Sequence, residues 1–113
     1  MKTVRSADGT TIAFDQVGSG PPLILVGAAF NDRSATAPLA KSLETRFTVF
    51  NYDRRGRGNS GDTPPYAVDR EIKDLEALIG VAGGSAFVFG FSSGAVLALK
   101  AAAGGLRITK LGQ

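Results

Sequence analysis

The chain has 113 residues, of which 43% are apolar and 20% are charged, and its net charge is +3. This length and composition predict one compact domain over residues 1–113 with a single core. The sequence contains neither cysteine nor histidine, which excludes disulfides and removes the commonest zinc ligands, so we expect no metal and no cofactor. No run approaches the roughly 20 apolar residues that span a membrane, and residues 1–10 contain no apolar signal segment. We therefore expect a cytoplasmic protein without membrane contact.

The first part of the chain predicts a hairpin followed by a buried strand. Residues 3–6 and 10–17 flank Ala7-Asp8-Gly9, and the second run alternates apolar with polar side chains. This pattern is typical of an antiparallel hairpin at a half-solvated edge of a sheet. After a turn of glycine and proline, residues 23–26 are apolar throughout, which predicts a strand buried on both faces.

The middle of the chain predicts a helix, a strand, a loop and a second helix. Pro38 suits the first turn of a helix with Leu39 and Leu43 on its inner side, and residues 47–52 predict a strand. Residues 53–65 are rich in glycine, proline and charge, so we expect a loop. An apolar stripe at helical spacing predicts the next helix: Val68, Ile72, Leu75, Ile79 and Ala82. The charged residues off this stripe are predicted to form its solvated face: Asp69, Arg70, Lys73, Asp74 and Glu76.

The last part predicts a strand, a helix and a strand, at residues 86–89, 94–103 and 107–111. Strands and helices thus alternate after the hairpin. This order predicts an α/β fold, a mostly parallel sheet of about six strands with an N-terminal antiparallel hairpin and helices on both faces. Ligands of such sheets bind beyond the carboxyl ends of the strands. We expect a site where three segments leave the strands at that edge: residues 27–30, 53–62 and 91–94.

The turn GFSSG places Ser92 between Gly90 and Gly94, after a predicted strand and before a predicted helix. Glycine at these two positions lets the chain turn tightly, which fits the pattern of a serine nucleophile presented above a sheet. The helix that follows supplies positive partial charge and free N–H groups, so the Ser93 N–H is the natural donor to a developing oxyanion. The alternative is an ordinary turn in which the Ser92 hydroxyl caps the helix.

A second oxyanion donor is expected from the segment after the strand at residues 23–26. Gly27 permits close approach there, and Ala28 or Ala29 supplies the N–H. The sequence offers no histidine to take the proton from Ser92. A serine hydroxyl is a poor nucleophile without an adjacent base, so this chemistry is predicted to be slow.

The loop at residues 56–61 also matches GxGxxG, the pattern of a dinucleotide-binding turn. In that motif the glycines open a helix that holds the pyrophosphate, whereas Asp62-Thr63-Pro64-Pro65 follows here. This difference argues against binding of NAD or FAD. The arginines of the loop have no interleaved aromatic residues for base stacking, so we expect no nucleic-acid partner.

Together these motifs resemble those of α/β-hydrolase fold enzymes, over nearly the whole chain. The run YDRRGRGNSG at residues 52–61 resembles the D-x-R-G-x-G-x-S segment after their fourth strand, and it lies between a glycine-bearing strand end and GFSSG. The resemblance implies Ser92 as the nucleophile, with the N–H groups of Ser93 and Ala28 in the oxyanion hole. It also implies that the remaining motif residues support the turn and brace the loop: Gly27, Gly90, Gly94, Asp53, Arg55, Gly56, Gly58 and Ser60.

The resemblance also implies that part of the catalytic set is missing. Members of the family continue after the sixth strand with a lid and two further strands, whose loops bear the catalytic acid and histidine. Asp53 is implied to be a loop brace and is a weak base at neutral pH, and Lys100 lies about two helical turns beyond the serine. We therefore expect a truncated, esterase-like serine hydrolase with weak activity on a small ester substrate.

A non-catalytic function is the alternative. In that case the chain is a structural or binding half-fold that self-associates or complements a second chain. The predicted strand at residues 107–111 would form an open edge of the sheet with apolar surface beside it. We expect a homo-oligomer that forms through this C-terminal strand edge.

Overall fold

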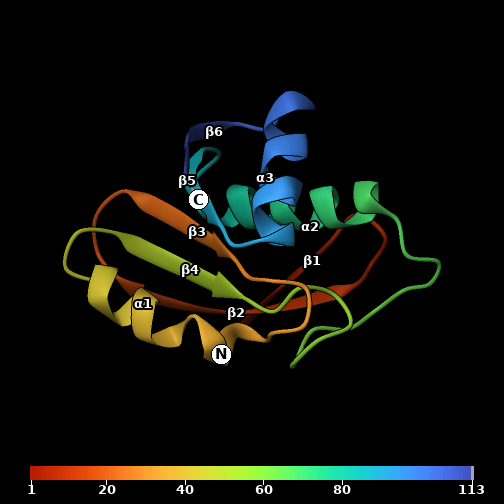
Figure 1. The fold of residues 1–113 in the computed structure, drawn as a ribbon, viewed down its shortest axis with the longest axis horizontal. Helices are drawn as coiled ribbons and strands as arrows, with labels where there is room; N and C mark the ends of the chain where they lie inside the picture. Colours follow the sequence, from red (N-terminus) through yellow and green to blue (C-terminus); the bar gives the residue numbers. More distant parts are fainter. Residues whose placement is uncertain (113) are drawn as a thin grey trace.

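The computed structural model describes residues 1–112, which form a sheet of six strands in the order β1-β2-β4-β3-β5-β6 (Figure 1). The pairings of β1 with β2 and of β2 with β4 are antiparallel, and the other three are parallel. The predicted α/β class is therefore confirmed, with the hairpin at one edge of the sheet and β6 at the other. The strands are β1 (Lys2–Arg5), β2 (Thr11–Gly18), β3 (Pro22–Val26), β4 (Thr48–Tyr52), β5 (Ala86–Gly90) and β6 (Ile108–Gly112).

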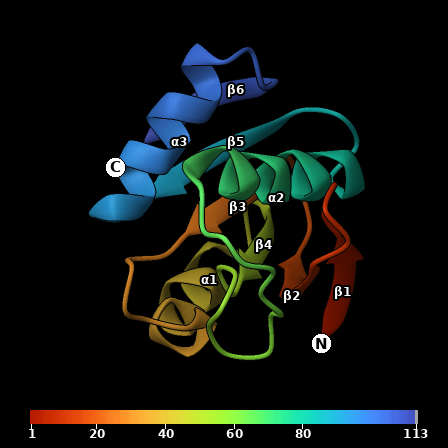
Figure 2. The same cartoon turned by 90° about the vertical axis from the view of Figure 1, so that its right-hand side faces the viewer.

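Helices cover both faces of the sheet, as predicted (Figure 2). The helix α1 (Ala37–Leu43) lies on one face, and α2 (Val68–Val81) and α3 (Ser93–Ala103) lie on the other. A 3-10 turn, η1 (Arg33–Ala35), precedes α1, whose first turn contains a proline because no backbone N–H is needed there. Within residues 1–112, no helix is both long enough and apolar enough to cross a bilayer.

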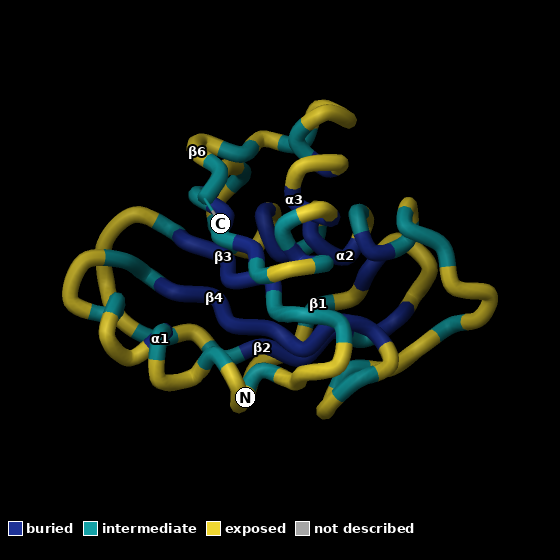
Figure 3. The backbone as a smooth tube through the Cα atoms, in the orientation of Figure 1, coloured by how far each residue is buried: buried dark blue, intermediate teal, exposed yellow. Residues whose placement is uncertain are grey.

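The larger core lies between the sheet and the helices α2 and α3. The apolar stripe of α2 packs there, with Leu75 and Leu78 fully buried. Buried backbone follows β2, β3 and β4 through the centre of the molecule (Figure 3). A smaller core lies on the side of α1, where Ala40 packs in one cluster with Leu25 and Val49. The central strands are apolar on both faces because helices cover both.

The register of the sheet aligns the ends of the parallel strands. Val26 at the end of β3 is opposite Gly90 at the end of β5, and Leu25 is opposite Asn51 near the end of β4. The segments that leave these three strands therefore start from the same edge of the sheet. This edge is where open α/β sheets bind their ligands.

Candidate active site

Three segments meet at the carboxyl ends of the parallel strands. The Phe91 N–H donates a hydrogen bond of 3.0 Å to the Val26 carbonyl, which joins the segments after β5 and β3. The segment after β4 joins them through Arg54, whose Nη1 donates to the Gly27 carbonyl at 3.1 Å and to the Ser93 hydroxyl at 2.8 Å. The structure thus brings together the three segments in which the sequence predicts a site.

Ser92 occupies a strained turn between β5 and α3. Its φ of 53° and ψ of −120° lie in a region that residues with a side chain rarely adopt. No other non-glycine residue within 1–112 has a positive φ. Ser92 is exposed, and its side chain forms no capping hydrogen bond with α3. The alternative in which the Ser92 hydroxyl caps the helix therefore does not describe this turn.

Gly90 and Gly94 let the backbone close around Ser92. A Cβ atom at Gly94 would lie 2.6 Å from the Gly27 carbonyl oxygen, and one at Gly90 would lie 2.6 Å from the Ala95 Cα. Both separations are far below the roughly 3.5 Å at which nonbonded heavy atoms attract one another. Glycine at position 94 therefore allows α3 to lie directly against the end of β3, and glycine at position 90 allows the end of β5 to lie against the first turn of α3.

The N–H groups of Ser93 and Ala28 are available as hydrogen-bond donors. Neither donates to any acceptor in the part of the chain that the structure describes. Ser93 is the first residue of α3, so its N–H has no partner within the helix and lies at the positive end of the helix dipole. Ala28 directly follows Gly27, whose carbonyl lies against Gly94. Both candidate donors therefore belong to segments that are in contact at the Ser92 turn.

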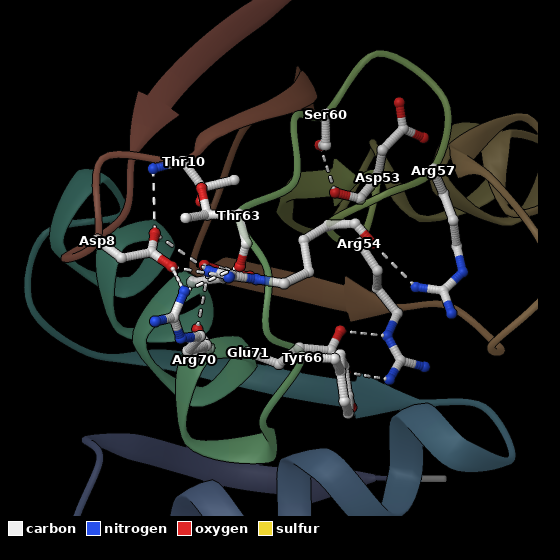
Figure 4. Close-up of polar contacts among 12 residues, drawn as sticks. Asp8, Thr10, Asp53, Arg54, Arg57, Ser60, Thr63, Tyr66, Arg70 and Glu71 are labelled. Carbon is white, nitrogen blue, oxygen red and sulfur yellow. Dashed lines mark hydrogen bonds and ion pairs between the residues drawn. The ribbon is translucent and has the colours of Figure 1, made fainter.

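Asp53 is buried and holds the loop that follows β4. Its carboxylate accepts hydrogen bonds from the backbone N–H groups of Arg33, at 2.6 Å, and Asn59, at 2.8 Å, and from the Arg33 guanidinium. The Ser60 hydroxyl donates to the Asp53 carbonyl at 2.6 Å (Figure 4) and accepts from the Ala13 N–H of β2 at 2.9 Å. These contacts tie the loop after β4 to η1 and to β2.

Arg55 anchors the same loop to α2 and to the hairpin turn. Its guanidinium donates to the two oxygens of Asp74, at 2.6 and 2.8 Å, and to Asp8 at 2.8 Å. Hydrogen bonds from Arg55 and Thr10 hold the pKa of Asp8 well below its usual range. The prediction that Asp74 lies on the solvated face of α2 is wrong, because Asp74 is only 1% exposed. Pairing with Arg55 is what allows this carboxylate to be buried.

Arg54 and Glu71 form a second buried ion pair, beside Ser93, that the sequence motifs do not predict. The Arg54 Nε and Nη2 donate to the two Glu71 oxygens at 2.8 and 2.7 Å, and the Tyr66 hydroxyl donates to Glu71 at 2.6 Å (Figure 4). Burial favours the neutral form of Glu71, but these hydrogen bonds outweigh it and hold the pKa of Glu71 below its usual value. The sequence signals are the spacing of Glu71 and Asp74, which places both on one side of α2, and the two consecutive arginines of the loop, and neither signal says which charges will pair.

Two hollows lie on opposite faces of the sheet. One, of about 240 Å³, opens between α2 and α3 next to Ser93, with Arg54 and Glu71 in its polar wall and an apolar wall formed by Val68, Val96 and Leu97. The other, of about 450 Å³, lies on the side of α1 and is almost entirely apolar. Only the smaller hollow adjoins the Ser92 turn.

Comparison with known proteins identifies the family of this chain. The chain matches the model of the alpha/beta hydrolase family over residues 18–110. It is also 35% identical over 95 residues to the uncharacterized hydrolase YraK of Bacillus subtilis (strain 168), a match that covers 80% of this chain and 35% of the relative. The chain therefore belongs to the alpha/beta hydrolase family. It spans about a third of the length of that curated relative.

Solved structures of similar proteins contain the same arrangement of elements. An alpha/beta hydrolase from Sphaerobacter thermophilus DSM 20745 is 65% identical, with a TM-score of 0.96. A thermophilic esterase from Thermogutta terrifontis is 28% identical, with a TM-score of 0.86. Each match covers 97% of this chain and 43% of the solved chain. The fold described here thus corresponds to less than half of either relative.

Proposed function

We propose that this chain carries the nucleophile of a serine hydrolase that acts on small esters, with Ser92 attacking the ester carbonyl. The observation that carries the proposal is the strained, exposed turn at Ser92, closed by Gly90 and Gly94 at the N-terminus of α3. Backbone strain of this kind persists only where the surrounding structure enforces it, and it is concentrated at functional sites. The similarity to the Thermogutta terrifontis esterase supports an ester as the substrate.

In the proposed reaction the Ser92 oxygen bonds to the carbonyl carbon, and the carbonyl oxygen becomes an oxyanion. The N–H groups of Ser93 and Ala28 stabilise this charge, aided by the positive end of α3. Collapse of the intermediate breaks the bond to the alcohol and leaves an acyl group on Ser92, which water then releases as the acid. Because the chain contains no histidine, the serine proton passes to solvent and the departing alkoxide takes a proton from water.

Activity without a histidine is expected to be weak. Removal of the triad histidine from a serine protease lowers turnover by about 10⁶, and roughly 10³ to 10⁴ over water remains from the oxyanion hole and binding. We therefore expect cleavage of activated esters with good leaving groups, and none of amides. The hollow of about 240 Å³ beside Ser93 is large enough for a short acyl chain.

Hydrolysis of p-nitrophenyl acetate tests this proposal. We expect the purified chain to release p-nitrophenol faster than Ser92→Ala does. Ser85→Ala is the matched control, because Ser85 is also exposed but lies at the opposite end of β5, and its rate should equal that of the wild type. Equal rates for all three proteins would contradict the proposal.

The side of the sheet that faces α1 supports a second function, which is self-association. β6 is an edge strand, and the hollow of about 450 Å³ beside it is lined mostly by apolar side chains: Leu23, Leu39, Leu43, Phe47, Phe87 and Phe89. An open strand edge and uncovered apolar surface both favour association with another chain. We propose that a second copy covers this face, since each copy offers the same edge and the same hollow to its partner.

Sedimentation velocity tests self-association. We expect a dimer at high micromolar concentration, and we expect Phe87→Lys to shift the protein to monomer while circular dichroism shows that it is still folded. Val81→Lys is the control, because Val81 is an exposed apolar residue of α2 on the other face. A monomer at every concentration would contradict a dimer.

The cytoplasmic location stays a prediction, which cell fractionation tests.

A further inference from the structure

We propose that Arg54 is a positioning residue for the oxyanion hole and acts on both N–H donors at once. The inference rests on the proposed function of Ser92. A single guanidinium nitrogen of Arg54, Nη1, donates to the Gly27 carbonyl at 3.1 Å and to the Ser93 hydroxyl at 2.8 Å. Arg54 thus touches the residue that bears one donor and the peptide group that bears the other, the N–H of Ala28.

The contact with Gly27 fixes the direction of the Ala28 N–H. The Gly27 carbonyl and the Ala28 N–H belong to one planar peptide group, which is trans, so the two bonds point in opposite directions. Because Arg54 holds the carbonyl on its own side, it holds the N–H on the other side. A hydrogen bond to the carbonyl also polarises the peptide group, which strengthens its N–H as a donor.

The contact with Ser93 acts on the second donor. Ser93 is the first residue of α3, and its hydroxyl accepts the hydrogen bond from Arg54. This bond restrains the first turn of the helix, including the N–H that has no partner within it. Because the same nitrogen holds Gly27, Arg54 sets the spacing between the two donor-bearing segments.

Arg54 can hold both segments because its own position is fixed. It is 5% exposed, and its partner Glu71 is 1% exposed. Glu71 occupies the Nε and Nη2 of the guanidinium, and the Tyr66 hydroxyl holds Glu71 in turn. The planar guanidinium therefore presents Nη1 in one direction. A lysine has one nitrogen and no such fork, so it cannot serve both sets of contacts with the same geometry.

Arg55 offers a matched comparison within the same loop. It is the next residue, it is also buried, and it pairs with Asp74 of α2 through two hydrogen bonds in the same manner. Its other hydrogen bonds from the guanidinium go to Asp8 and to the Arg70 carbonyl. Loss of this pair therefore removes a buried link between the loop and α2 without removing a contact to Gly27 or Ser93.

The test compares two double variants, Arg54→Met/Glu71→Leu and Arg55→Met/Asp74→Leu. Each removes one buried pair without leaving a lone buried charge, which would be strongly destabilising. The first readout is the pair of backbone amide resonances of Ala28 and Ser93 in isotope-labelled protein, which requires no activity. We expect both resonances to shift in the Arg54 double variant and to stay near their wild-type positions in the Arg55 double variant.

The second readout is hydrolysis of p-nitrophenyl acetate. Removal of one oxyanion donor from an enzyme lowers turnover by about 10² to 10³, so misdirected donors should lower kcat by about tenfold or more. We expect this fall in the Arg54 double variant, with KM little changed, and a smaller fall in the Arg55 double variant. If the Arg54 double variant does not fold, the single variant Arg54→Lys, which keeps Glu71, is compared with the Arg55 double variant instead.

The two readouts separate failure of this inference from failure of the proposed function. If the amide resonances shift equally in both double variants, or shift in neither variant, the positioning role of Arg54 is overturned, whatever the activity. If the wild type shows no hydrolysis that depends on Ser92, but the resonances shift only when Arg54 is replaced, the proposed function fails. The control of the two N–H groups by Arg54 then stands.

Discussion

The two faces of the sheet are packed to different extents. On the side of α2 and α3, a continuous core includes the fully buried Leu75 and Leu78, and two buried ion pairs link α2 to the loop after β4. On the side of α1, four buried residues form a small core, next to a hollow of about 450 Å³. The Ser92 turn leads into α3, so the candidate nucleophile belongs to the more completely packed face.

The candidate site and the uncovered apolar surface therefore depend on different parts of the chain. The turn, its glycines and the free N–H groups depend on β3, β5, α3 and the loop after β4, all of which are present and in contact. The apolar surface on the side of α1 is left uncovered within residues 1–112. We therefore expect the candidate site to be formed in this chain even though the opposite face is open to a partner.

The largest expected effect comes from truncating the core of the packed face. Leu75→Ala should lower the free energy of unfolding by about 3–5 kcal/mol, because Leu75 is fully buried and its neighbours cannot close the cavity. Leu43→Ala on α1 should lower it by less than about 2 kcal/mol, since Leu43 is only partly buried and borders the hollow. Urea denaturation measures both, and equal losses would show that the two faces contribute alike.

A smaller effect is expected at the turn itself. Gly94→Ala places a Cβ atom 2.6 Å from the Gly27 carbonyl oxygen, and we expect it to destabilise the protein by about 1–3 kcal/mol through overpacking. It should also lower ester hydrolysis, because α3 must move away from β3. Gly80→Ala is the control, since a Cβ there meets open space on α2 and alanine should raise stability by up to about 1 kcal/mol. A Gly94→Ala variant with wild-type stability and activity would contradict the close packing of the turn.

The smallest expected effect is the acid dependence of the Arg54 and Glu71 pair. The pKa of Glu71 lies below its usual value in the folded protein, so the pair stabilises the fold above the unfolded pKa of about 4.3 and loses this contribution as pH falls through the folded pKa. The double variant Arg54→Met/Glu71→Leu lacks this contribution and leaves no lone buried charge, so we expect the stability of the wild type to fall more than that of the double variant as the pH is lowered through this range. Thermal unfolding across this range measures the difference, and a gap independent of pH would exclude the ion pair as its source.

Much of the fold follows from local sequence patterns. Alternation of apolar and polar residues indicates the hairpin, continuous apolar runs indicate the central strands, and the stripe from Val68 to Ala82 indicates α2. The segments that form the site also follow, because parallel strands place their carboxyl ends at one edge. The position of the Ser92 turn is predicted by the glycines on either side of it.

Contacts between distant residues are harder to predict. The helical stripe assigns Asp74 to solvent, since charged residues normally face water, but Arg55 from the loop reaches under α2 and neutralises it. The pair of Arg54 and Glu71 escapes prediction for the same reason. Local periodicity does not reveal which charged residue will meet a partner 17 or 19 positions away in the sequence.

Reaction with a fluorophosphonate probe, followed by peptide mapping, tests the central claim most directly. A serine oxygen displaces fluoride and forms a stable phosphonyl adduct, a reaction assisted by the same N–H donors as ester cleavage. We predict an adduct on Ser92 that forms faster than on exposed serines outside the turn, such as Ser42 and Ser85. An absence of adduct on Ser92, or labelling spread evenly over the exposed serines, would show that the turn does not present a nucleophile.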